Sequence, residues 1–253
     1  MGRDEMLNEQ EFPVDEIVTP EEETPSDIPC TPITASRLGF RYSIDFLMAI
    51  LLGTVFLLPI FFFIQGTEFE LLFGALFTQL GFLAVGLYRI RQIRKQGQPF
   101  LPMFEGPLGP ALRWGLIAGI ILFVLNVLHG CFLEFYMDVD LAENNPWIAM
   151  ENFSFWTKVG TFAVGGIMAP IVEELMLRGV MFGSFAASGY PIIGTLFTMI
   201  LFVILHLDPI NSVAYAMLGL GFLWVYSRTR NLTAAILAHA MNNLLGFLFI
   251  LIP

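Results

Sequence analysis

The sequence predicts an all-α, polytopic membrane protein, a helical bundle of about seven transmembrane spans. The chain of 253 residues is 56% hydrophobic and only 13% charged, whereas soluble domains carry roughly a quarter charged residues. Several apolar stretches also reach the roughly 20 residues that a helix needs to cross a hydrocarbon core about 30 Å thick. Charges inside these stretches therefore need an explanation.

Residues 1–36 differ from the rest of the chain in composition. They hold ten acidic residues against one basic residue, Arg3, and five prolines. Such a segment buries too little apolar surface to offset the entropy lost on ordering. We therefore expect a disordered acidic tail that carries most of the net charge of −10.

The two cysteines do not form a framework. Cys30 lies in the tail and Cys131 lies near the end of an apolar stretch. One pair so placed gives neither a disulfide pattern nor metal-ligand spacing, so we expect ordinary thiols.

Seven apolar stretches follow the tail. They cover residues 43–64, 70–89, 113–134, 155–187, 192–206, 211–227 and 231–252. The fourth is too long for one plain span. We expect Gly165, Gly166 and Pro170 to break or kink it, because proline removes a backbone donor and clashes with the preceding turn. The fifth and sixth are short for a full crossing, which is tolerated where helix ends are buried in protein.

Basic residues predict the orientation of these spans, because cytoplasmic loops are enriched in lysine and arginine. Threading the chain through seven crossings puts the basic flanks on one side: Arg37, Arg41, Arg89, Arg91, Arg94, Lys95, Arg113, Arg228 and Arg230. The opposite loops hold acidic residues, with Lys158 nearby: Glu68, Glu70, Asp138, Asp140, Glu143, Glu151 and Asp208. We expect a cytoplasmic N terminus and an external C terminus.

The membrane part divides into two regions, 37–149 and 150–253. In the first, the polar residues Asp45, Gln79, Asn126 and His129 are typical of hydrogen-bond partners between helices. The second region is different, because charged and polar residues recur in it at helical spacing.

Three charges lie within two helical turns in the stretch GIMAPIVEELMLRG, residues 166–179. Neighbours on a helix diverge by about 100°, so Glu173 and Glu174 cannot face one partner. Glu174 and Arg178 have the i,i+4 spacing of an ion pair, and an unpaired charge in a membrane is costly. Glu173 has Leu177 at that spacing, which leaves it the less satisfied carboxylate and a candidate for proton exchange. The alternative is a buried network that only locks helices together.

Two further pairs have i,i+4 spacing. Phe202 and His206 lie in FVILH, and His239 and Asn243 lie in HAMNN. At about 1.5 Å per residue, Glu173 and His206 lie roughly 20 Å from the cytoplasmic ends of their helices. Asn243 lies at roughly 18 Å and His239 at roughly 12 Å. We expect these four groups to meet around one cavity.

These residues resemble the CPBP family of intramembrane proteases, also called the CAAX-prenyl endopeptidase and bacteriocin-processing, or Abi, family. Its motifs are EExxxR, FxxxH and HxxxN. All three occur here in order, within about residues 150–250: Glu173, Glu174 and Arg178, then Phe202 and His206, then His239 and Asn243.

The resemblance implies hydrolysis of a peptide bond in or at the membrane, with a peptide or protein substrate, and makes 150–253 a catalytic core. It assigns the activation of water to Glu173 with help from His206. It assigns stabilisation of the oxyanion to His239 and Asn243. Supporting roles fall to Glu174, Arg178 and Phe202. It implies no metal or other cofactor, and no nucleic-acid partner is expected.

Two alternatives compete with the glutamate-dependent protease. Glu173, His206 and His239 could hold zinc in a metalloprotease, but there is no HExxH pair and Asn243 would have no role. The chain could instead be a non-catalytic immunity or scaffold protein, or a transporter. Transporters favour repeated broken helices in two halves, and we find no such symmetry.

Overall fold

The computed structural model describes residues 33–140 and 152–251, which lie in the compact unit Pro32–Pro253. Within these ranges the regular structure is helical, apart from one isolated bridge between Phe104 and Asn231. The elements are α1 (Ala35–Ile64), α2 (Phe69–Lys95), α3 (Leu108–Met137), α5 (Phe155–Ala163), η2 (Val164–Met168), α6 (Ala169–Glu174), η3 (Leu175–Phe182), α7 (Gly183–Ala187), α8 (Pro191–His206), α9 (Ser212–Thr229) and α10 (Leu232–Leu251).

The predicted fold class, a helical membrane bundle, is confirmed. Each predicted span coincides with a helix or a run of joined helices in the described ranges. By length and composition, four of these are able to cross a membrane: Ala35–Ile64, Phe69–Lys95, Leu108–Met137 and Phe155–Ala187. Pro191–His206 and Leu232–Leu248 are shorter apolar helices. The chain is therefore an integral membrane protein.

Two helices begin before their predicted spans. Helix α1 begins at Ala35, because the hydroxyl of Thr34 accepts a hydrogen bond from the backbone of Arg37 (3.4 Å) and caps the first turn. Helix α3 begins at Leu108, directly after Pro107. The predicted start of α1 followed the apolar residues alone, whereas the capped helix includes the mixed flank that precedes them.

Where a break or kink was predicted at Gly165, Gly166 and Pro170, the helix is not broken but changes its geometry. Residues Phe155–Ala187 form one continuous helical run of 33 residues, in which two segments, η2 and η3, are π-helical. The backbone N–H of Ala169 reaches the carbonyl of Val164, five residues back. This wider turn ends beside Pro170, so the helix accommodates the proline by widening.

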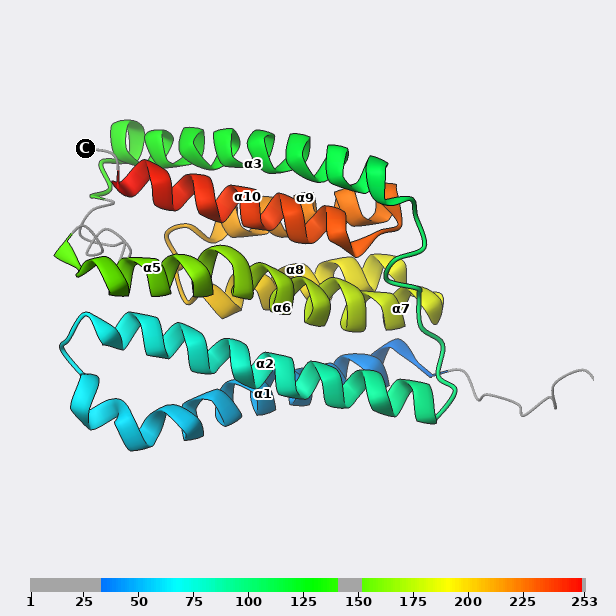
Figure 1. The fold of residues 1–253 in the computed structure, drawn as a ribbon. Helices are drawn as coiled ribbons and strands as arrows, with labels where there is room; N and C mark the ends of the chain where they lie inside the picture. Colours follow the sequence, from blue (N-terminus) through cyan, green and yellow to red (C-terminus); the bar gives the residue numbers. More distant parts are fainter. Residues whose placement is uncertain (1–32, 141–151, 252–253) are drawn as a thin grey trace, which may run out of the picture. The chain divides into compact units, whose positions relative to one another are not determined.

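The run α5–α7 is the central element of this arrangement (Figure 1). Its helices contact the α1–α2 hairpin on one side and α10 on another, while α3 packs along α10. In its most apolar window 56% of the residues are buried, against 11% in α1. The sequence therefore presents its main charge cluster on the most enclosed helix.

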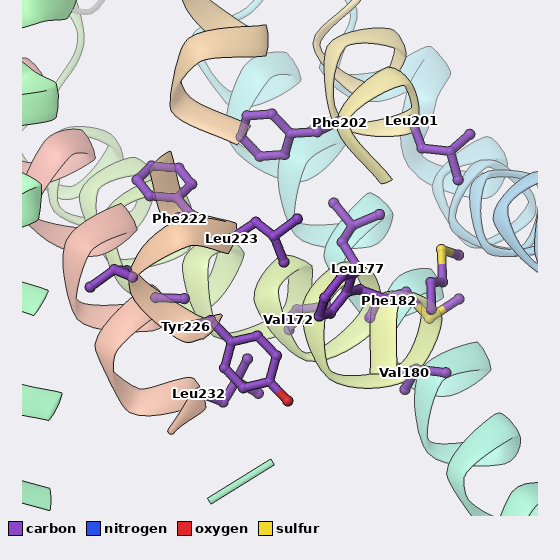
Figure 2. Packing of buried hydrophobic residues seen from close by; sticks show 14 of the residues in the cluster. Val172, Leu177, Val180, Phe182, Leu201, Phe202, Phe222, Leu223, Tyr226 and Leu232 are labelled. Atoms are coloured by element: carbon purple, nitrogen blue, oxygen red, sulfur yellow. The ribbon is translucent and has the colours of Figure 1, made fainter. Parts of the chain in front are cut away.

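Apolar side chains from distant parts of the chain surround this run. Figure 2 shows the packing of side chains from α6, η3, α8, α9 and α10: Val172, Leu177, Val180, Phe182, Leu201, Phe202, Phe222, Leu223, Tyr226 and Leu232. The core therefore continues across the helices that carry the three motifs.

Some predictions fall on residues outside the described ranges. They concern most of the acidic tail, with Cys30, and the loop residues Glu143 and Glu151. The other cysteine, Cys131, is a free and exposed thiol.

Candidate active site

Glu174 is the centre of a buried charge cluster. Its Oε1 atom accepts hydrogen bonds from Arg178 Nη1 and from His239 Nδ1, each at 2.9 Å. The three side chains are at most 2% exposed. The predicted i,i+4 ion pair is confirmed, and it follows from one helical turn between α6 and η3. The contact with His239 joins this helix to α10, 65 residues later.

Arg178 and His239 are held by aromatic rings as well as by Glu174. The guanidinium lies 4.9 Å from the centre of the Phe202 ring and 5.7 Å from that of Phe222, distances typical of cation–π contacts. Its Nη2 atom donates to the carbonyl of Gly219 (2.8 Å). The His239 ring stacks on Phe222 at 4.5 Å. Phe202 of the FxxxH motif therefore packs against the charge cluster.

Glu173 faces a different partner from Glu174, as their adjacent positions on a helix predict. Its Oε1 atom accepts a hydrogen bond of 2.7 Å from Gln79 Nε2 of α2. Its Oε2 atom is buried and has no hydrogen-bond partner among the described residues. The residue is 6% exposed, so one carboxylate oxygen is held by a hydrogen bond and the other is buried without a partner among the described residues.

His206 ends helix α8 with a fixed ring. Its Nδ1 atom lies 2.8 Å from the carbonyl oxygen of Phe202. A carbonyl can only accept, so Nδ1 carries the proton and Nε2 of the neutral ring is an acceptor. The ring stacks on Tyr215 at 4.0 Å.

Asn243 is tied to the widened turn that precedes Pro170. Its Nδ2 atom donates to the carbonyl of Gly165 at 2.9 Å. In a π turn this carbonyl would accept from the residue five positions later, which is Pro170 and has no N–H. Asn243 therefore supplies the donor that the proline lacks. Its Oδ1 atom accepts from Asn242 (3.1 Å).

The structure thus joins part of the predicted site by direct contacts. Hydrogen bonds or ring contacts connect Glu174, Arg178, His239, Phe202 and His206. Glu173 and Asn243 make their hydrogen bonds to Gln79 and Gly165 instead. Within the described ranges, no three His, Cys, Asp or Glu side chains form a group suited to a metal ion.

Two residues beside the site lie outside the motifs. Gln79 was predicted only as a general partner between helices, and that prediction is confirmed by its bond to Glu173. Phe222, which contacts both Arg178 and His239, was not predicted. Neither has a local signal in the sequence, because each acquires its partner by packing of distant helices.

Comparison with known proteins finds similarity in the C-terminal part of the chain. Residues 155–245 match the family model described as type II CAAX prenyl endopeptidase Rce1-like. A curated relative, the "Putative membrane peptidase YdiL" of Bacillus subtilis (strain 168), is 31% identical over 80 residues. That alignment covers 32% of this chain and 33% of the relative, so it spans about a third of either protein.

No solved structure matches the chain. The matched segment 155–245 contains every residue of the three motifs, from Glu173 to Asn243. The resemblance drawn from the motifs is therefore confirmed, and the C-terminal part of this chain is similar to the Rce1-like, type II CAAX prenyl endopeptidase family.

Proposed function

We propose that the protein is an intramembrane endopeptidase that hydrolyses a peptide bond with water activated by Glu173. The observation that carries this proposal is the state of that carboxylate. It is buried, held through one oxygen by Gln79, and unpaired at the other. Buried polar atoms are otherwise nearly always hydrogen-bonded, and exceptions call for an explanation such as catalysis.

The first step is the attack of water on the peptide carbonyl. Glu173 Oε2 takes one proton from water as the oxygen forms its bond to the carbonyl carbon. His206 Nε2, an acceptor in the neutral ring, holds the second hydrogen of the same water. The carbonyl electron pair moves to the oxygen, which gives a tetrahedral intermediate with one negative charge. The proton on Glu173 then passes to the leaving nitrogen as the C–N bond breaks, which restores the carboxylate.

The negative oxygen of the intermediate needs donors. Asn243 uses one of its two Nδ2 hydrogens for Gly165, and the second is available. His239 directs Nδ1 at the carboxylate of Glu174, so Nε2 is a donor when the ring is positively charged. We therefore propose Asn243 and His239 as the oxyanion donors, with Glu174 and Arg178 in support.

A zinc peptidase is the competing enzymatic proposal. Glu173, His206 and His239 are chemically suited to zinc, although they do not form a ligand group in the described structure. The test is cleavage by detergent-purified protein after exhaustive chelation, with metal content measured by mass spectrometry. The glutamate mechanism predicts unchanged turnover. Loss of activity that stoichiometric zinc restores would make these residues ligands.

The substrate proposed is a peptide or protein in or at the membrane. Membranes from cells with wild-type protein and with Glu173→Gln should differ in newly formed peptide termini, read by terminal-peptide mass spectrometry. Termini present only with the wild type would identify the cleavage site and show whether it is near a prenylated C terminus. Identical sets of termini would favour the immunity or scaffold alternative.

We also propose that the N terminus is cytoplasmic and the C terminus external. The support is the distribution of basic residues at the helix ends, such as Arg94 in the last turn of α2 and Arg228 in the last turn of α9. A reporter fused after Pro253 should behave as non-cytoplasmic. A cytoplasmic signal would mean that one of the shorter helices does not cross the bilayer.

A further inference from the structure

We infer that Gln79 is a positioning residue for Glu173 and that α2 thereby belongs to the active site. This inference rests on the proposed function. It extends the site beyond residues 155–245, the segment similar to peptidases. The contact joins residues 94 positions apart in the sequence, so the motifs themselves contain no sign of it.

The chemistry of the contact is specific. Gln79 is 5% exposed and its Nε2 atom donates to Glu173 Oε1 at 2.7 Å, within the range of a charge-assisted hydrogen bond. A carboxylate held at one oxygen has its plane and its second oxygen fixed. Oε2, the atom proposed to take the proton from water, is the one left unpaired. An amide does not titrate, so it holds the carboxylate without competing for that proton.

The face of α2 that carries Gln79 is the face that packs on the catalytic helix. Gln79, Phe82 and Gly86 lie at i, i+3 and i+7 and are all buried. A side chain at Gly86 would meet the sulfur of Met176 at 3.5 Å, which places this face against η3, directly after Glu173 and Glu174. Gln79 therefore reaches Glu173 as part of a packed interface between helices.

Close packing between α1 and α2 fixes the position of Gln79 along the axis of α2. A side chain at Gly81 would collide with the carbonyl oxygen of Ala49, and one at Gly53 would meet the carbonyl of Phe77 at 2.6 Å. Small residues at such contacts let helix backbones approach closely in membranes. The two contacts lie two residues to either side of Gln79, so neither helix can slide without moving it.

Both ends of the hairpin are also fixed to the central helical run. Near one end, Tyr42 donates to the hydroxyl of Ser184 in α7 at 2.6 Å. At the other, the backbone of Ser154, the N-cap of α5, donates to the exposed carboxylate of Glu68. This bond holds the pKa of Glu68 below its ordinary value. Such anchoring is what a positioning residue on α2 requires.

The test compares Gln79→Leu, which removes the donor at similar volume, with the wild type. Misplacing a catalytic group by about 1 Å costs on the order of 100-fold in rate, and loss of a partner that orients a catalytic ligand costs about 10- to 100-fold. We expect kcat to fall about 10- to 100-fold while KM changes little, because Gln79 does not touch the substrate.

A second variant, Gln79→Glu, separates positioning from packing. Two carboxyl groups can share a hydrogen bond only while one of them is protonated. We expect activity close to wild type at acid pH and a steep loss as pH rises, relative to the wild-type profile. The neighbouring charged groups, Glu174, Arg178, His206 and His239, are the same in both proteins, so the difference reports on the added carboxyl.

The matched control is Asp45→Asn, which removes the charge and one of the two acceptors that Asp45 presents to Arg89 between α1 and α2 and leaves Gln79 intact. Its turnover per folded molecule should equal that of the wild type. Equal losses in the control and in Gln79→Leu would reduce Gln79 to a packing residue and overturn the inference. If Gln79→Leu had the kcat of the wild type, the inference about Gln79 would be overturned and the proposed function would stand. If the wild type showed no cleavage that depends on Glu173, both would be overturned.

Discussion

Two buried polar clusters in this protein differ in how completely their atoms are paired. In the α1–α2 hairpin, Arg89 donates Nε and Nη2 to the two oxygens of Asp45, at 2.7 and 2.5 Å. In the proposed active site, Glu173 Oε2, Glu174 Oε2 and Arg178 Nε are buried without a hydrogen-bond partner among the described residues. The first cluster is closed, whereas the second retains atoms that can take part in chemistry.

From this difference we infer which charges stabilise the fold and which belong to the proposed site. A bidentate arginine–carboxylate pair offsets the cost of burying both charges through two short hydrogen bonds. In a cluster with unpaired donors and acceptors, hydrogen bonds offset only part of the cost of burying the charges. Natural proteins tolerate such incomplete pairing mainly at functional sites. Within the second cluster Oε2 is unpaired in both glutamates, but Oε1 of Glu174 accepts from Arg178 and His239, whereas Oε1 of Glu173 accepts from Gln79 only.

The largest expected effect comes from the same substitution at the two adjacent glutamates. Glu173→Gln should abolish cleavage and leave the amount of folded protein near wild type, because the amide keeps the shape and removes an unpaired charge. Glu174→Gln should lower the amount of folded protein, because Arg178 loses its ion-pair partner. Turnover and folded fraction after purification measure both. A stable, inactive Glu174→Gln beside a degraded Glu173→Gln would reverse the two roles.

Removing the cation of the cluster should mainly affect folding. Arg178→Ala leaves Glu174 charged and buried, and breaking a buried ion pair costs roughly 3–5 kcal/mol of unfolding free energy. Denaturation in detergent measures the loss. The control is Arg91→Ala, at an exposed arginine of α2, which should change stability little. Equal stability of the two variants would contradict the supporting role proposed for Arg178.

Asn243 combines a structural contact with a proposed chemical role, because it donates to Gly165 and is also proposed as an oxyanion donor. Asn243→Ala should lower kcat about 100- to 1000-fold and cost about 1 kcal/mol of stability through the lost bond to Gly165. Steady-state kinetics and denaturation separate these effects.

Pro170→Ala supplies the matched background for that experiment. An alanine N–H at this position can donate to the helix, so the carbonyl of Gly165 no longer depends on Asn243. The double variant Pro170→Ala, Asn243→Ala should therefore recover stability and remain slow. Recovery of turnover together with stability would show that Asn243 acts only through the helix.

The smallest expected effect lies in the closed cluster. Asp45→Asn should cost about 1–3 kcal/mol of stability, less than Arg178→Ala, because Arg89 is 15% exposed and Arg178 only 1%. Denaturation of the two variants under one set of conditions gives the ranking. A stability loss at Asp45 larger than that at Arg178 would contradict the distinction between the clusters.

Local sequence patterns were sufficient for much of the fold. Apolar length gave the helices in order, and i,i+4 spacing gave the Glu174–Arg178 pair, since both depend on residues less than one helix apart. The expected break or kink at Gly165, Gly166 and Pro170 takes the form of a π turn and not of a break, because one additional residue per turn accommodates the proline and leaves the helix continuous. The start of α1 was predicted too late in the sequence, because its cap, Thr34, lies outside the apolar run.

The sequence by itself determined that this is a membrane protein, that its helices follow in this order, and that its motif residues lie on particular helix faces. Only the tertiary structure decided the partner of each residue: Gln79 for Glu173, His239 for Glu174, and the carbonyl of Gly165 for Asn243. The physical reason is the separation along the chain of the residues that interact. Helix periodicity is set by neighbours along the chain, whereas these hydrogen bonds depend on how close-packed helices meet, with glycines such as Gly53 and Gly81 setting the distance.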